Sequence, residues 1–200
     1  MCVFCLLSSY TLELEDSTTK EFKVFGEKWG DNSLPNATGG VVSYSFADQN
    51  VPGQFAEFDS FITDASFKSE INQAFSVWEN SADIRFSLAV DTAAVDIRFG
   101  WGNIDGKGGI LGQTTVPSSG PLNNVVVVLD SDEDWFLFGD APSSQIDFSS
   151  TVLHEIGHAI GIDHSESEQA LMNAAYSTTL FTLQQDDIDA ATSIYGENDI

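Results

Sequence analysis

The sequence predicts a mixed α/β (α+β) domain, and three observations lead to this fold class. Short runs of apolar residues alternate with segments in which apolar residues recur every three or four positions. The order along the chain is strands and one helix, then a second helix, a loop and a final helix. With 200 residues, 42% of them hydrophobic, the chain is also long and apolar enough to bury one sizeable core.

The first predicted elements are a strand, a helix and two further strands. Residues 41–46 (VVSYSF) follow a Gly-Gly turn and predict a strand. Residues 66–80 predict a long amphipathic helix packed on the sheet, because their apolar side chains recur at helical spacing. Residues 84–88 and 94–99 predict the next two strands.

The remaining elements are a buried strand and two helices. Residues 125–129 are almost wholly apolar, which predicts a strand inside the sheet. Residues 147–161 predict the second long helix, whose last residue is a glycine that can end it. Its candidate N-caps are Asp147, Ser149 and Ser150. Residues 183–195 predict a C-terminal helix, with Asp186 and Asp187 near its positive end.

The charge of the chain restricts its partners. It has 31 acidic and 7 basic residues and a formal net charge of -24. Phosphate binding needs clustered Lys and Arg, so nucleic acid and anionic membrane surfaces are disfavoured as partners. So much acid is typical of a protein that stays soluble in salt, binds calcium, or both. No stretch of the sequence is long and apolar enough to predict insertion into a membrane.

All three histidines of the chain lie in the run 154–164 (HEIGHAIGIDH). His154 and His158 are four residues apart, so on a helix both imidazoles leave the same face. Gly161 allows the backbone to turn sharply, so that His164 can return toward the same point. Three neutral imidazoles suit one tetrahedral zinc ion and leave its fourth position open, which is typical of a catalytic site.

Glu155 directly follows the first predicted ligand, beside the metal but outside its ligand set. In favourable sites zinc lowers the pKa of a bound water to about 7. A carboxylate at this position can take the proton of that water and pass it to a leaving amine. The motif therefore predicts hydrolysis of a peptide bond, with Glu155 as the general base.

With Glu155, Gly161 and His164 all in place, the motif resembles that of the metzincin peptidases. The serine directly after the third histidine, Ser165, is a feature that resembles the matrixins within the metzincins. The resemblance covers roughly residues 25–196. The segments that carry it outside the motif are Lys28-Trp29, Val42–Phe46, Ala170-Leu171-Met172, Tyr176 and residues 181–196.

The resemblance implies the metzincin fold, with a twisted mixed sheet and two long helices plus a C-terminal helix. It also implies an active-site cleft along an edge strand at residues 109–113, where an extended peptide can pair with the strand. Met172 would form an apolar floor beneath the zinc. Asn173 and Ala174 stand where matrixins usually have Tyr and Pro, so the wall of the pocket for the residue after the scissile bond is altered.

The family pattern has two further metal sites, of which only the calcium site is expected in this chain. In matrixins a second, structural zinc is held by histidines at positions that correspond to about Arg98, Gln113 and Val128 here. None of these is a histidine, so one zinc ion is expected in total. A structural calcium site is implied by two sequence-distant loops, and six oxygen ligands suit that ion. Its ligands would be the carboxylates of Asp105, Asp130 and Glu133 and the carbonyls of Gly106, Gly108 and Ile110. The alternative is a solvated Gly-rich turn beside an acidic loop.

Two other functions compete with a monomeric, secreted zinc endopeptidase acting on protein or peptide substrates. The first is a catalytically silent zinc- and calcium-binding module of a larger surface protein, against which the intact Glu155 argues. The second is a calcium-dependent adhesion module, which would need the acidic loops but not three zinc ligands.

Residues 1–22 are assigned to an N-terminal tail and residues 23–200 to the catalytic domain. The tail contains both cysteines, Cys2 and Cys5, which are interpreted as part of a flexible leader or as residues with a metal or latency role. The tail is a poor match to a secretory signal, so secretion is expected by a route that this sequence does not reveal, and the chain is compatible with being a fragment of a longer protein.

Overall fold

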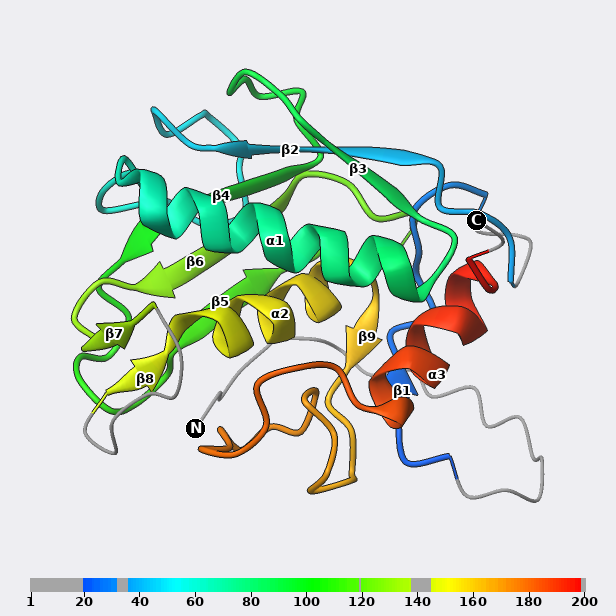
Figure 1. Cartoon of the computed structure of the whole chain (residues 1–200). Helices are drawn as coiled ribbons and strands as arrows, with labels where there is room; N and C mark the ends of the chain where they lie inside the picture. The colour runs from blue at the N-terminus through cyan, green and yellow to red at the C-terminus, as the bar shows by residue number, and fades with distance from the viewer. Residues whose placement is uncertain (1–19, 32–35, 119, 138–144, 199–200) are drawn as a thin grey trace.

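A five-stranded mixed sheet forms one layer of the computed structural model, with spatial order β3-β2-β4-β6-β5 (Figure 1). Four strands are parallel, and β5 pairs antiparallel with β6 at one edge. The strands are β2 (Val41–Phe46), β3 (Arg85–Leu88), β4 (Ile97–Gly102), β5 (Gly112–Thr115) and β6 (Val125–Asp130). All six residues of β6 are buried, which confirms the prediction of a strand inside the sheet.

The structure describes residues 20–31, 36–118, 120–137 and 145–198. The prediction of an N-terminal tail, with Cys2 and Cys5, falls mostly outside these residues. No helix in the described part of the chain is long and apolar enough to cross a membrane.

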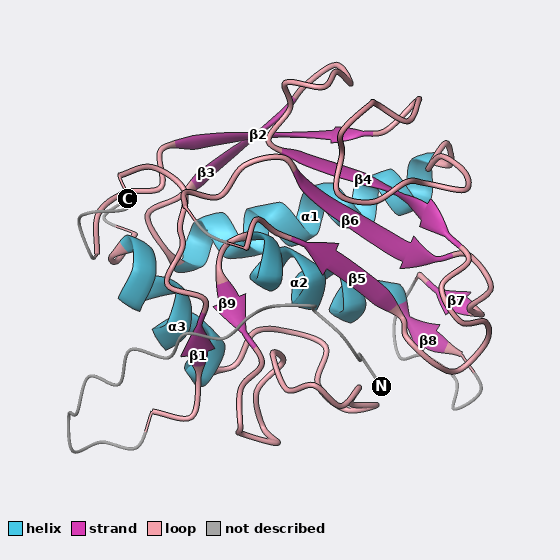
Figure 2. Ribbon diagram, turned by 180° about the vertical axis from the view of Figure 1, so that it is seen from behind, coloured by secondary structure: helices cyan, strands magenta, loops and turns pink. Residues whose placement is uncertain are grey.

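Two helices cover one face of the sheet, and the view from behind shows the strands in front of them (Figure 2). They are α1 (Ala65–Ser81), which Asp64 caps, and α2 (Phe148–Ala159), which Asp147 caps by accepting the Ser150 N–H at 2.7 Å. The third helix, α3 (Gln185–Tyr195), packs against α1 and β1. The mixed α/β class with two long helices and a C-terminal helix is confirmed.

The main core lies between the sheet and the helices. Phe75 and Trp78 of α1, Phe99 of β4 and Ile156 of α2 are all at most 2% exposed. The Trp78 indole N–H donates to the Leu153 carbonyl at 3.0 Å, which joins the two long helices. Burial of such large side chains is the main stabilising contribution, at about 2–3 kcal/mol for each.

Two small sheets complete the described structure. β1 (Lys23–Val24) pairs antiparallel with β9 (Ile162–Asp163), and β7 (Trp135–Phe136) pairs parallel with β8 (Ile146–Asp147). The pairing of β1 with β9 brings the start of the described chain against the segment that leads to His164.

The prediction of a strand over residues 94–99 is wrong at its start. Ala93 and Ala94 form a turn, and the paired strand is Ile97–Gly102. The predicted edge strand is also displaced, because residues 107–109 form a turn and a bend and the paired part is Gly112–Thr115. Gly106 and Gly108 both have φ of +84°, a left-handed conformation that interrupts a strand.

The face of the sheet opposite the helices carries a buried ion pair. Arg98 and Asp91 have side chains only 3% and 2% exposed, and the Arg98 Nε–H donates to Asp91 Oδ1 at 2.8 Å. The Ser45 hydroxyl donates to the same carboxylate at 2.6 Å, and the Phe58 ring covers the guanidinium. This network ties the loop before β4 to the sheet.

We expect this ion pair to make the stability fall in acid. Burial alone would raise the pKa of Asp91, but hydrogen bonds from Arg98, Ser45 and the Asp48 N–H, with the charge of Arg98, together lower that pKa to about 2. Because the folded pKa lies below the ordinary value of 3.8, the stabilisation is present above about pH 4 and is lost as the pH falls toward 2. Its size is on the order of 2 kcal/mol.

The measurement is the free energy of unfolding of zinc-depleted protein between pH 5 and pH 2. Asp91→Asn should lack the decrease in unfolding free energy attributed to Asp91. Glu57 is an exposed acid on the loop between β2 and α1, so Glu57→Gln should keep that decrease. An Asp91→Asn curve parallel to that of the wild type over this range would contradict the prediction.

Candidate active site

Helix α2 and the turn after it bring the three histidines together. His154 and His158 lie one turn apart on α2, and candidate ligand nitrogens of His154, His158 and His164 all lie within 4.8 Å of one another. Gly161 makes the turn, with φ of +99°, and a Cβ there would lie 2.4 Å from the Glu27 carbonyl oxygen. A residue other than glycine therefore cannot occupy this turn without displacing the backbone.

Carbonyl oxygens orient two of the three imidazoles. His154 Nδ1 lies 2.8 Å from the Leu171 oxygen, and His158 Nδ1 lies 2.8 Å from the Ile162 oxygen. A carbonyl only accepts, so each Nδ1 carries the proton and each Nε2 presents a lone pair. His158 Nε2 and His164 Nε2 are 3.2 Å apart, and buried His154 Nε2 has no hydrogen-bond partner among the described residues.

The imidazoles are kept neutral by their surroundings. Burial lowers the pKa of His154 to about 4 and the pKa of His158 well below its ordinary value. Burial also lowers the pKa of His164. Three neutral, converging imidazoles with one buried nitrogen that lacks a partner are the donor set that a zinc ion needs, so these residues fit the metal.

The predicted base lies between the ligands and the edge strand. Glu155 is 1% exposed, and its carboxylate Oε2 lies 2.7 Å from the hydroxyl of Thr114 on β5. No signal in the sequence points to Thr114, because Thr114 and Glu155 are 41 positions apart and belong to no common motif.

Met172 packs beneath the ligand helix. It is 1% exposed, and a Cβ at Gly157, between the two helical ligands, would lie 2.3 Å from its sulfur. The Ser165 N–H donates to the Met172 carbonyl at 2.9 Å, so the segment after the third histidine is attached to this turn. The arrangement agrees with an apolar floor under the histidines.

The first strand of the described chain supports the same region. The Phe25 N–H donates to the Gly161 carbonyl at 2.9 Å. The Phe25 ring stacks on the His158 imidazole, with centroids 5.9 Å apart and an angle of 27° between the planes. This contact was not predicted, since it depends on the pairing of β1 with β9.

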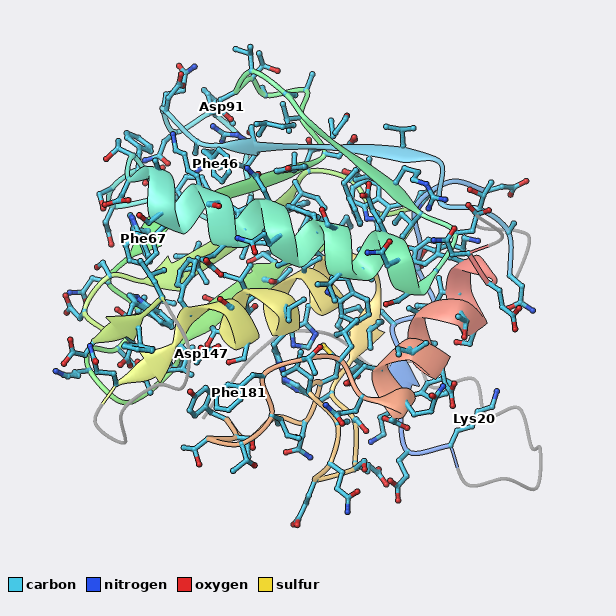
Figure 3. All side chains as sticks on the ribbon, in the orientation of Figure 1. Lys20, Phe46, Phe67, Asp91, Asp147 and Phe181 are labelled. Carbon is cyan, nitrogen blue, oxygen red and sulfur yellow. The ribbon has the colours of Figure 1, made fainter. Side chains whose placement is uncertain are left out.

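A pocket of about 410 Å³, partly open to solvent, lies beside His154 and Glu155. Asp147, labelled in Figure 3 at the start of α2, donates its N–H to the Tyr176 hydroxyl at 2.9 Å and so fixes one side of the wall. Asn173 joins this wall to the loop after His164, since its amide donates to the carbonyls of Ser165 and Ser167. The lining residues are Leu111, Ser150, Thr151, His154, Glu155, Ala170, Leu171, Asn173, Ala174, Ala175, Tyr176, Ser177 and Leu180.

The two loops of the predicted calcium site lie against each other. The Gly108 N–H donates to the Glu133 carboxylate at 2.6 Å, and the Asp105 N–H donates to the Asp130 carboxylate at 3.3 Å. The Asp105 carboxylate accepts the Ile110 N–H at 2.8 Å. Within the described residues, only the three histidines form a tight group of metal-ligating side chains, so the calcium site stays a prediction.

The three positions that correspond to the family's second zinc site hold no histidine and have other contacts. Gln113 and Val128 are paired neighbours on β5 and β6, and Arg98 binds Asp91 on the outer face of the sheet. The expectation of a single zinc ion stays a prediction.

Residues 45–196, about three quarters of the chain, match the matrixin family. The chain belongs to the matrixin family. The expected metzincin fold is thereby confirmed. The family is zinc-dependent, and the three-histidine cluster of this chain is like a zinc site.

Curated relatives cover most of this matrixin chain. It is 36% identical over 149 residues to metalloendoproteinase 1 of Glycine max, covering 68% of this chain and 47% of the relative. It is 31% identical over 161 residues to the hatching enzyme of Paracentrotus lividus, covering 76% and 26% respectively. It is 29% identical over 202 residues to matrix metalloproteinase-C of Caenorhabditis elegans, covering 90% and 34%. The match thus spans less than half the length of each of these relatives.

Proposed function

We propose that this chain is a zinc-dependent endopeptidase that cleaves extended protein or peptide substrates. The observation that carries the proposal is the convergence of His154, His158 and His164 beside the buried carboxylate of Glu155. A pocket opens next to that carboxylate, where a substrate side chain can be held. Membership of the matrixin family supports the same activity.

The residues of the site have separate roles in the proposed reaction. Bound zinc would polarise the substrate carbonyl and make water a nucleophile near neutral pH. Glu155 accepts the proton of that water and later donates it to the leaving amine. The edge strand β5 offers backbone groups to an extended peptide, and the pocket receives the side chain after the scissile bond.

The test is a peptide-library cleavage assay with and without a zinc chelator, together with metal analysis of dialysed protein. We expect hydrolysis that the chelator removes and zinc restores, with one equivalent of zinc per chain. Zinc binding without hydrolysis of any peptide would favour the silent module, and two equivalents would contradict the single site.

We predict that the residue just after the scissile bond is apolar and of medium to large size. Leu111, Leu171 and Leu180 contribute apolar surface to the pocket, and the described residues that line it include no Lys or Arg to attract an acidic side chain. Ala174→Leu should shift the preference at this substrate position toward smaller side chains, because the larger Leu side chain narrows the pocket. A cleavage profile dominated by Asp or Glu at this position would contradict the prediction.

We also propose a structural calcium ion held by Asp105, Asp130 and Glu133 with the carbonyls of Gly106, Gly108 and Ile110. The two loops already face each other, and a hard divalent ion would offset the repulsion between their carboxylates. Calcium should therefore raise the melting temperature, since binding to the folded state alone adds about 2.7 kcal/mol at a hundredfold excess over Kd.

The measurement is thermal unfolding of zinc-loaded protein with calcium, with magnesium or with neither ion. Asp130→Ala should lose most of the calcium effect. Asp134→Asn is the matched control, because Asp134 lies in the same acidic run but forms an exposed pair with Lys107 outside the ligand set. An unchanged melting temperature after complete calcium removal would leave these residues as a solvated acidic loop.

We further propose that the protein is secreted and monomeric. The predominance of acidic residues supports solubility without association, and family membership supports action outside the cell. Light scattering at several concentrations tests the monomer, and detection of the protein in the culture medium of its source tests secretion.

A further inference from the structure

Strand β5 supplies more than a pairing edge. Alternate residues of a strand face the same side, and Gly112 and Thr114 both face α2. Thr114 is 2% exposed, and its hydroxyl oxygen lies 2.7 Å from Glu155 Oε2 and 3.0 Å from the Glu155 carbonyl oxygen. An ionised carboxylate only accepts, so the hydroxyl is the donor in the shorter contact.

Gly112 allows the Glu155 side chain to lie directly against the strand. A Cβ at Gly112 would be 2.8 Å from Glu155 Cγ and 3.0 Å from Oε1. These distances are shorter than ordinary van der Waals contact. The glycine and the threonine together form a fitted surface for the side chain of the predicted base.

The contact suits the orientation of a base. A hydrogen bond to an ionised group is stronger than one between neutral groups, so the single Thr114 proton favours the carboxylate over the carbonyl. Thr114 is also β-branched and buried in a paired strand, opposite Val127, which restricts its side-chain rotation. The hydroxyl is therefore held in place before substrate arrives.

We propose that Thr114 is a positioning residue that holds the Glu155 carboxylate in the orientation needed for proton transfer. The proposal rests on the proposed peptidase function, because it assigns Thr114 a part in the same reaction. Thr114 acts through Glu155 and does not itself touch the reacting atoms.

The kinetic test compares Thr114→Val with Thr114→Ser. Valine has the same shape and suits a strand, but it lacks the hydroxyl, whereas serine keeps it. Thr114→Val should lower kcat about tenfold or more, with KM changed less than about twofold and zinc content unchanged. Thr114→Ser should recover most of the loss. Thr114→Ala, which also lacks the hydroxyl, should behave like Thr114→Val and replaces it if that variant does not fold.

Three kinetic outcomes would overturn the proposal. A normal kcat in Thr114→Val would show that the hydroxyl is not needed. Equal losses in the Val and Ser variants would indicate a packing role. A rise in KM alone would place the effect in substrate pairing with β5 and not in the base.

A second measurement does not depend on hydrolysis. In zinc-depleted protein, Thr114→Val should lower the melting temperature by several degrees, because the buried Glu155 carboxylate loses the hydrogen bond from the Thr114 hydroxyl. In a Glu155→Met background no carboxylate remains and only the backbone carbonyl of residue 155 can accept the hydroxyl, so the same substitution should cause a clearly smaller decrease. Equal decreases in both backgrounds would overturn the contact. If no peptide is cleaved by the wild type, the proposed function fails, while this cycle still decides whether Thr114 holds Glu155.

Discussion

Replacing Glu155 with Gln should reduce peptide hydrolysis by about 100- to 10,000-fold while zinc stays bound. The carboxamide cannot accept a proton, but it has the same shape and still accepts the Thr114 hydroxyl. His154 and His158 keep their carbonyl partners, because these are the backbone oxygens of Leu171 and Ile162, which the substitution does not change. The loss should therefore appear in kcat, and metal analysis should still return one equivalent of zinc.

The matched control is Glu168→Gln, which changes the same chemical group on the exposed loop after the third histidine. This variant should retain the wild-type rate. Near-normal turnover in Glu155→Gln would remove Glu155 from the role of base, and loss of zinc from the variant would instead assign it a part in metal retention.

The parts of the site that could be predicted from the sequence are those whose signal is local. His154 and His158 are four apart on a helix, Asp147 caps that helix, and Gly161 turns the chain at its end. Each of these features follows from helix geometry or from a single residue's allowed backbone angles. The arrangement of His164 needs only the short segment after the glycine.

The parts that escaped prediction depend on contacts between distant segments. Nothing in the sequence relates Thr114 to Glu155 or Phe25 to His158, since strand pairing and helix packing bring them together. The sequence relates Arg98 only to the position of a histidine in the family's second zinc site. In the structure Arg98 pairs with Asp91, which lies seven residues away on a loop. Spacing of this kind has no periodicity that would reveal an ion pair.

Strand β4 shows why strand ends are hard to predict. Gly100 and Gly102 weaken a strand pattern, because glycine has no side chain to pack. In the structure a Cβ at Gly100 would lie 2.3 Å from the Phe58 ring, so glycine is required by the loop that crosses the outer face. The strand therefore continues to Gly102, through residues whose local preference opposes it.

Replacing Asp187 with Ala should lower the free energy of unfolding by about 3 kcal/mol, because buried backbone donors would lose their acceptor. The Asp187 side chain is buried at the start of α3 and accepts three N–H groups, those of Leu171, Met172 and Gln184, at 2.7–2.9 Å. For a domain of this size the melting temperature should fall by roughly 6–12 °C. Zinc affinity should fall as well, since the Leu171 carbonyl orients His154.

The matched control is Asp186→Ala, which removes an acid from the same first turn of α3 and so changes the interaction with the helix dipole equally. Asp186 is half-buried and accepts only a hydroxyl, that of Ser165, in its described contacts, so we expect a loss of less than about 1 kcal/mol. Thermal unfolding with and without zinc measures both effects. Similar decreases in unfolding free energy in the two variants would attribute the effect to the charge at the helix start. A large decrease confined to Asp187→Ala would attribute it to the three N–H groups, which hold the Met172 turn beneath the histidines.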